Sequence, residues 1–102
     1  MLEVKSVTLV EKGAAMFPDA PSQRGARHLE ELTTARKKGF EAAVLFIVQR
    51  SDGIYFAPNS ERDPAFSAAL REAYGSGVKV YAYSCNVSLD RIELGDSIPV
   101  CI

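Results

Sequence analysis

The chain has 102 residues, which is the usual size of one domain and enough to bury one core. Apolar residues make up 47% and charged residues 25%, so the composition is that of a globular protein and excludes a disordered chain. The longest apolar run, residues 42–48, is too short to span a bilayer, and we expect no membrane association. The first residues lack the apolar stretch of a signal peptide, which predicts a cytoplasmic protein.

The cysteine content and the charge further limit the kinds of site and ligand that the sequence allows. Cys85 and Cys101 form no Cys-x-x-Cys motif and the chain has one histidine, which disfavours a zinc site. We expect two reduced thiols that pack as small hydrophobic groups; a disulfide or a reactive thiol is the alternative. The net charge is −1, with a balance of +2 over residues 1–40 and −3 over residues 41–102. Any nucleic-acid contact must therefore be local, transient, metal-assisted or shared with another chain or domain.

The first forty residues predict a strand, a hairpin and a helix. Residues 2–10 alternate between the two faces of a strand, with Glu3, Lys5, Val7 and Leu9 on one of them. A turn at Glu11-Lys12-Gly13 leads to a short returning strand at residues 14–17, and prolines then force a loop. Ser22 is a suitable N-cap for a helix over residues 23–38.

The rest of the chain predicts the following elements: a strand at 42–48, a loop at 51–62, a helix that Asp63-Pro64 begins and Gly75 ends, a strand at 78–85, and short strands around Ile92, Leu94 and 98–102. The uninterrupted apolar run at 42–48 is typical of a strand covered on both faces. This strand–helix–strand order predicts one α/β domain over residues 1–102, with a mainly parallel sheet flanked by helices. In such sheets, functional sites gather near strand ends.

Glu3 and Lys5 are the residues best placed for chemistry. Two positions apart on a strand, they project from one face and lie roughly 6.5–7 Å apart along it. The carboxylate can hold Mg²⁺ or Mn²⁺, and such a cation polarises a phosphate and lowers the pKa of a bound water. The lysine can orient that water or stabilise charge on phosphorus. The pair suits phosphodiester hydrolysis, although the same spacing also occurs at the solvated end of an ordinary first strand.

Three stretches of the chain also carry a resemblance. They read LEVKSVTLV at 2–10, MFPDAPSQRG at 16–25 with His28-Leu29 following, and VLFIVQR at 44–50. Pro58-Asn59, Asp63-Pro64-Ala65-Phe66 and Gly77-Val78 follow in order. In these motifs, over essentially its whole length, the sequence resembles the sugar fermentation stimulation protein A family.

The resemblance implies a C-terminal domain of the PD-(D/E)xK nuclease fold, with a restriction-endonuclease-like mixed sheet, that follows an OB-like nucleic-acid-binding domain. Glu3 and Lys5 match the family's Glu-x-Lys element, which implies DNA binding or DNA/RNA cleavage. The OB-like domain is missing here, and so is an upstream Ser-Arg-x-Asp element whose aspartate would be the second metal ligand. Asp19 either supplies a replacement carboxylate or belongs to a turn. With one certain acid, we expect weak metal binding and weak cleavage by this chain alone.

Five other polar residues are candidates for the site. Arg24 and Arg27 lie on the first turns of the expected helix and suit phosphate binding, although Arg27 also fits an ion pair one turn along. His28 either contacts phosphate and moves a proton or is a surface residue. Gln49 and Arg50 end the apolar strand, where Gln49 either hydrogen-bonds in the site or simply reaches water.

Three functions are consistent with these residues. In a nuclease, Glu3 binds Mg²⁺ while Lys5 and Gln49 assist hydrolysis of DNA or RNA. In a DNA-binding regulator of sugar metabolism genes, the same fold is a scaffold without turnover. In an interaction module, a second copy covers an exposed sheet edge and forms a homodimer.

Overall fold

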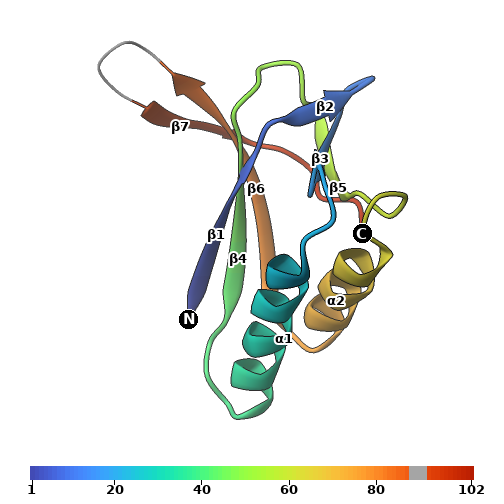
Figure 1. Cartoon of the computed structure of the whole chain (residues 1–102). Helices are drawn as coiled ribbons and strands as arrows, with labels where there is room; N and C mark the ends of the chain where they lie inside the picture. The colour runs from blue at the N-terminus through green and yellow to red at the C-terminus, as the bar shows by residue number, and fades with distance from the viewer. Residues whose placement is uncertain (88–91) are drawn as a thin grey trace.

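The computed structural model describes residues 1–87 and 92–102, which form two sheets and two helices (Figure 1). The larger sheet has the order β1-β4-β6-β7, with strands Leu2–Val7, Ala43–Val48, Lys79–Val87 and Ile92–Ser97. The smaller sheet has the order β2-β3-β5, with strands Leu9–Glu11, Ala14–Phe17 and Tyr55–Pro58. Strands β1, β4 and β6 are parallel and β7 is antiparallel to β6, which confirms an α/β fold with a mixed sheet. The helices α1 (Gln23–Lys37) and α2 (Pro64–Gly75) lie side by side along the larger sheet (Figure 1).

The first expected strand is divided between the two sheets. Strand β1 ends at Val7 and β2 begins at Leu9, so the chain leaves the larger sheet at Thr8. The hairpin is confirmed, but it joins β3 to β2 and not to β1. Its turn places both Lys12 and Gly13 at positive φ, 50° and 86°, the conformation of a tight two-residue hairpin turn that glycine adopts without strain.

The expectation of a loop over residues 51–62 is wrong in its middle, because β5 runs from Tyr55 to Pro58. Strand β5 pairs in parallel with β3. Phe56 of β5 is fully buried and stacks on Phe46 of β4, with ring centroids 4.1 Å apart. A strand of four residues that ends in a proline gives almost no periodic signal, so its pairing partner and the buried ring define it.

Both predicted helix starts are confirmed, and the structure ties them together. Ser22 caps α1 by accepting a hydrogen bond from the backbone N of Gly25 at 3.0 Å. Asp63 caps α2 by accepting from the backbone N of Phe66 at 2.9 Å, and its second oxygen accepts from the backbone N of Ser22 at 2.8 Å. Gly25 allows the helices to approach closely, since a Cβ there would lie 3.1 Å from the Phe66 ring. One buried carboxylate therefore joins the beginnings of α1 and α2.

The helices cover one face of the larger sheet. The covered face carries Val44, Phe46 and Val48 of β4 and, in register with them on β1, Glu3, Lys5 and Val7. On the opposite face, Val4, Leu45 and Tyr81 lie side by side, and Val4 and Tyr81 are exposed. Within residues 1–87 and 92–102, the expected cover on both faces of β4 is therefore not found.

Cys85 and Cys101 are both free thiols, as expected. Cys85 is buried, but Cys101 is exposed, so the expectation that it packs as a small hydrophobic group is wrong. Its backbone N instead donates to the carbonyl of Phe56 at 2.7 Å, which holds the end of the chain against β5. Neither helix of the described residues is long and apolar enough to cross a membrane.

Phe56→Ala should lower the free energy of unfolding by about 3–5 kcal/mol, because it removes a buried ring that links the two sheets. Phe40→Ala is the matched control: this ring is 64% exposed, and its removal should change the free energy by less than about 0.5 kcal/mol. Urea denaturation followed by circular dichroism measures both values. Equal effects of the two substitutions would contradict the placement of β5 in the core.

Candidate functional site

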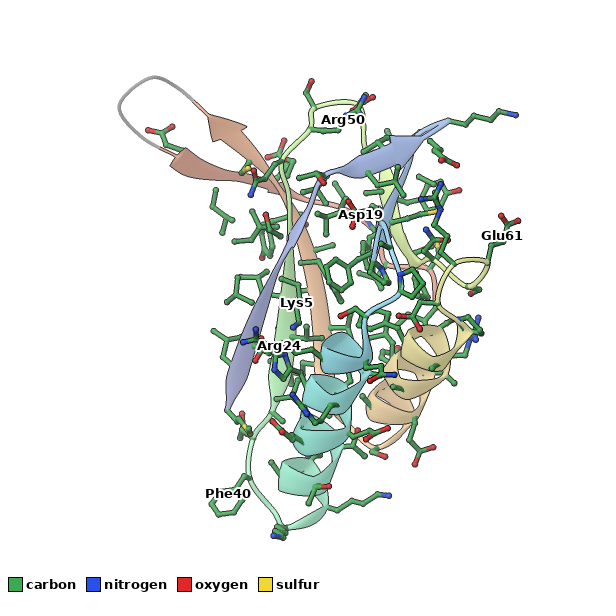
Figure 2. All side chains as sticks on the ribbon, in the orientation of Figure 1. Lys5, Asp19, Arg24, Phe40, Arg50 and Glu61 are labelled. Carbon is green, nitrogen blue, oxygen red and sulfur yellow. The ribbon has the colours of Figure 1, made fainter. Side chains whose placement is uncertain are left out.

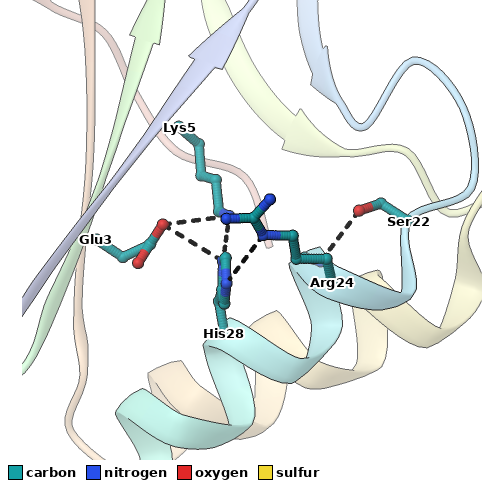
Figure 3. A network of polar contacts seen from close by, with 6 residues as sticks. Glu3, Lys5, Ser22, Arg24 and His28 are labelled. Carbon is teal, nitrogen blue, oxygen red and sulfur yellow. Dashed lines mark hydrogen bonds and ion pairs between the residues drawn. The ribbon is translucent and has the colours of Figure 1, made fainter.

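Glu3 and Lys5 project from the same face of β1, and their side chains meet (Figure 3). The Lys5 Nζ lies 3.3 Å from Glu3 Oε1. The Lys5 side chain is 12% exposed and that of Glu3 is 32% exposed, so the pair sits where the core of the domain meets solvent. The predicted juxtaposition is therefore present, in a position that a small ion or a phosphate oxygen can reach.

His28 joins this pair from α1. Its Nδ1 lies 2.6 Å from Lys5 Nζ and 3.4 Å from Glu3 Oε1, and its side chain is only 19% exposed (Figure 3). The sequence left open whether His28 is a surface residue or part of the site, and the structure places it against both charged groups of β1. We refer to Glu3, Lys5 and His28 as the β1–α1 cluster.

The contact with Lys5 determines which nitrogen of His28 carries a hydrogen. A lysine ammonium only donates hydrogen bonds, so His28 Nδ1 must accept, and the neutral ring then carries its hydrogen on Nε2. Arg24 Nε lies 3.5 Å from that Nε2, and a guanidinium also only donates. A neutral imidazole cannot accept at both nitrogens, and the much shorter contact, with Lys5, is the one that forms.

Arg24 and Arg27 add positive charge beside the cluster. Both are exposed on the first turns of α1, and neither forms an ion pair within the described parts of the chain. The ion pair that the sequence allowed between Arg27 and Glu31 is thus not formed. The one carboxylate, that of Glu3, faces the cations of Lys5 and of the neighbouring Arg24, so the cluster and its surroundings favour an anion such as a phosphate.

Gln49 and Arg50 lie apart from the β1–α1 cluster. Gln49 donates from its side-chain amide to the hydroxyl of Ser6, a residue on the face of the sheet opposite Lys5. Arg50 binds Asp52 through two contacts, Nη2 to Oδ2 at 2.7 Å and Nε to Oδ1 at 3.0 Å, and Figure 2 shows it far from Lys5. The structure therefore does not bring these two candidates to the Glu-x-Lys pair.

Asp19 is exposed in the loop before α1. Its backbone carbonyl accepts a hydrogen bond from Arg62 Nη1 at 2.7 Å, which ties this loop to the loop before α2. Figure 2 shows Asp19 above Lys5 and above the first turn of α1, near β3. Asp19 therefore contacts the rest of the domain through its main chain, as an ordinary loop residue does.

The cluster offers one carboxylate to a divalent cation. Among residues 1–87 and 92–102, no group of three or more His, Cys, Asp or Glu side chains is arranged to hold a metal ion. A single carboxylate is still compatible with Mg²⁺, which commonly keeps several waters and takes further ligands from substrate phosphates. Glu3 therefore fits a hydrated, substrate-assisted magnesium site and does not by itself form a closed cage.

The sequence did not reveal that Asp63 positions the site. Its role as the cap of α2 is readable from Asp63-Pro64, but its second oxygen binds the N-cap residue of α1, 41 positions earlier. Through Ser22, this carboxylate fixes the first turn of α1, which carries Arg24, with His28 on the next turn. The capping signal identifies Asp63, and only the tertiary packing of the two helices shows what else it holds.

A family model described as "Sugar fermentation stimulation protein RE domain" matches residues 1–91. The chain belongs to the sugar fermentation stimulation protein (SfsA) family. An SfsA homolog from Desulforamulus reducens is 54% identical over 97% of this chain and 41% of its own length. One from Chloroflexus aurantiacus is 56% identical over 98% of this chain and 39% of its own length. The chain thus spans about two fifths of the length of these SfsA relatives.

A solved structure is also similar, that of Pyrococcus furiosus SfsA in complex with Ca²⁺. It shares 34% sequence identity with this chain and superposes with a TM-score of 0.92. The match covers 99% of this chain and 44% of the Pyrococcus furiosus chain. The α/β arrangement described above is therefore that of an SfsA protein.

In this SfsA chain, we predict that neutral His28 carries its hydrogen on Nε2, because Lys5 donates to Nδ1. His28 is the only histidine, so long-range ¹H–¹⁵N correlation spectra at a pH where the ring is neutral read its tautomer without overlap. Lys5→Met should remove the preference, whereas Lys38→Met, on the exposed end of α1, should leave it unchanged. A hydrogen on Nδ1 in the unaltered chain would show that Lys5 does not donate to this ring.

Proposed function

We propose that this domain binds the phosphates of nucleic acid at the β1–α1 cluster and that the full-length protein uses it for metal-dependent phosphodiester hydrolysis. The observation that carries this proposal is the contact of Lys5 with both Glu3 and His28, at 3.3 and 2.6 Å, on a solvent-accessible boundary of the core. The exposed Arg24 extends the positive charge along α1. An acid, an ammonium and an imidazole at hydrogen-bonding range are suited to binding and cleaving a phosphodiester.

Each residue has a distinct role in this proposal. Glu3 would hold Mg²⁺ or Mn²⁺, which when bound would polarise the phosphate and acidify a bound water. Lys5 orients the attacking water or stabilises negative charge on the phosphate oxygens, and His28 fixes the direction of the Lys5 side chain. Arg24 positions the nucleic-acid backbone through a charge-assisted contact. The Ca²⁺ named for the Pyrococcus furiosus protein supports a hard, oxygen-preferring cation here as well.

The SfsA resemblance supports further parts of the proposal. We assign this chain to a C-terminal domain of the PD-(D/E)xK nuclease fold, preceded in the full-length protein by an OB-like domain. That domain would supply much of the affinity for DNA or RNA, which agrees with a chain of net charge −1 that spans about two fifths of its relatives. A cytoplasmic location and a homodimer joined along an exposed sheet edge remain predictions.

A DNA-binding regulator without turnover is the second candidate. The observation that favours it is the single carboxylate of the cluster, since the described residues contain no group of three or more His, Cys, Asp or Glu side chains that could hold a metal. In this case Lys5 and Arg24 would still contact phosphate, and the link to sugar metabolism genes would arise from binding alone. The two candidates therefore differ in whether a bound strand is cut.

A cleavage assay separates them. Full-length protein and this chain are incubated with Mg²⁺ and labelled single- and double-stranded DNA and RNA. If the protein hydrolyses nucleic acid, we expect cut products only in the presence of Mg²⁺. The rate should be at least about 100-fold lower for Lys5→Ala, because the negative charge on the phosphate then lacks its counter-ion. Lys38→Ala is the matched control and should cleave at the parent rate. Retarded but uncut DNA, with an affinity that falls steeply with salt, would support the regulator, and equal cleavage by Lys5→Ala would remove the catalytic assignment.

A further inference from the structure

A cavity lies beside β6, on the other side of β4 from β1. Its volume is about 650 Å³, within the range of ligand pockets, and it lies between α2, the edge of β6 and the end of the chain. Val80, Ile98 and Val100 give it apolar walls, while Arg71 and Tyr74 of α2 line its rim. None of the residues assigned to the β1–α1 cluster borders it.

The cavity exists because the chain leaves the edge of β6 before that edge is fully paired. Strand β7 pairs with β6 from Tyr83 onward, and Ile98 N donates to the carbonyl of Ala82 at 2.9 Å. Pro99 has no N–H to donate to β6, and its carbonyl accepts a hydrogen bond from Phe56 N at 2.8 Å. Val100 forms a bridge with Phe56 of β5. The end of the chain therefore crosses to the smaller sheet instead of continuing along β6.

This departure leaves Val80 without a partner on that edge. Backbone groups of successive strand residues point alternately to the two sides of the strand. Lys79 N donates toward β4, to Ala42 O at 3.0 Å, and the Ala82 carbonyl points to the other side, so Val80 also directs its N–H and C=O to the open edge. Among the described residues, no hydrogen bond to these two groups is found. An open strand edge of this kind is a template for one more strand.

Arg71 supplies a charge beside the open edge. Its side chain is exposed and forms no ion pair in the described parts of the chain, and Tyr74, one turn along α2, is also exposed. We propose that this cavity binds the carboxyl terminus of an extended peptide. The peptide backbone pairs with Val80, its last apolar side chain enters the cavity, and its carboxylate binds Arg71.

The backbone geometry favours a peptide over a nucleotide. The open edge presents one N–H donor and one C=O acceptor at the spacing of a peptide unit. The backbone of an extended peptide can form hydrogen bonds to both groups at once. The phosphate of a nucleotide would match the charge of Arg71, and its base would stack on tyrosine. A nucleotide, however, has no backbone donor and acceptor spaced like those of an extended peptide. The apolar walls likewise suit an aliphatic side chain better than a ribose.

The test is an NMR titration of the ¹⁵N-labelled chain with acetyl-Thr-Val-Thr-Val as the free acid and as the C-terminal amide. We expect the amide signals of Val80 and Ala82 to shift, and the acid to bind about tenfold more tightly than the amide. Arg71→Gln should remove this preference and keep the weak binding of the amide, whereas Lys38→Gln should leave both affinities unchanged. A pattern of backbone amide signals like that of the unaltered protein shows that each variant is folded.

Three outcomes would overturn the proposal. The first is equal affinity of the unaltered chain for the acid and the amide. The second is a set of shifted signals that excludes Val80 and its neighbours on β6. The third is binding of adenosine or uridine monophosphate at this edge with no response to either peptide, which would assign the cavity to a nucleotide.

Discussion

The contact of Lys5 with Glu3 and His28 is the interaction on which the proposed site depends. Lys5 occupies a position of β1 that faces the helices, in register with the fully buried Phe46. An ammonium in such a place loses much of its hydration, and that cost is tolerated only when polar partners replace water. Glu3 supplies an opposite charge and His28 an acceptor, so the same contacts that make the charge tolerable also join β1 to α1 and gather the reactive groups.

The division of the chain between two sheets shapes both ends of the domain. The break at Thr8 sends β2 and β3 into the smaller sheet, which β5 extends and the residues after Pro99 touch through Phe56. The stacked rings of Phe46 and Phe56 hold that sheet against the larger one. Because the residues after Ile98 form hydrogen bonds with β5 of the smaller sheet, the edge of β6 stays unpaired at Val80. The proposed phosphate site and the proposed peptide site are thus separate consequences of one topology.

Local signals predicted much of this fold, and they failed where long-range pairing decides. Ser22 and Asp63 marked the helix starts because a capping side chain bonds within its own turn. Strand β5 was missed because its four residues acquire a strand identity only from pairing with β3. The alternation of β1 predicted that Glu3 and Lys5 share a face, but no pattern in one strand shows how α1 is rotated above it, and so the place of His28 stayed open. In the same way, the face to which Gln49 belongs follows from the register of β1 with β4, strands about 40 residues apart.

Calorimetric titration of Mn²⁺ shows directly whether the carboxylate beside Lys5 holds a divalent ion. We expect that the unaltered chain binds one Mn²⁺ and that Glu3→Gln weakens binding by about tenfold or more, because a neutral amide is a poorer ligand for a hard cation. Glu30→Gln, on the exposed face of α1, should bind as the parent does. Equal Mn²⁺ affinity of Glu3→Gln and the parent would show that the ion is held elsewhere and that Glu3 is not a metal ligand.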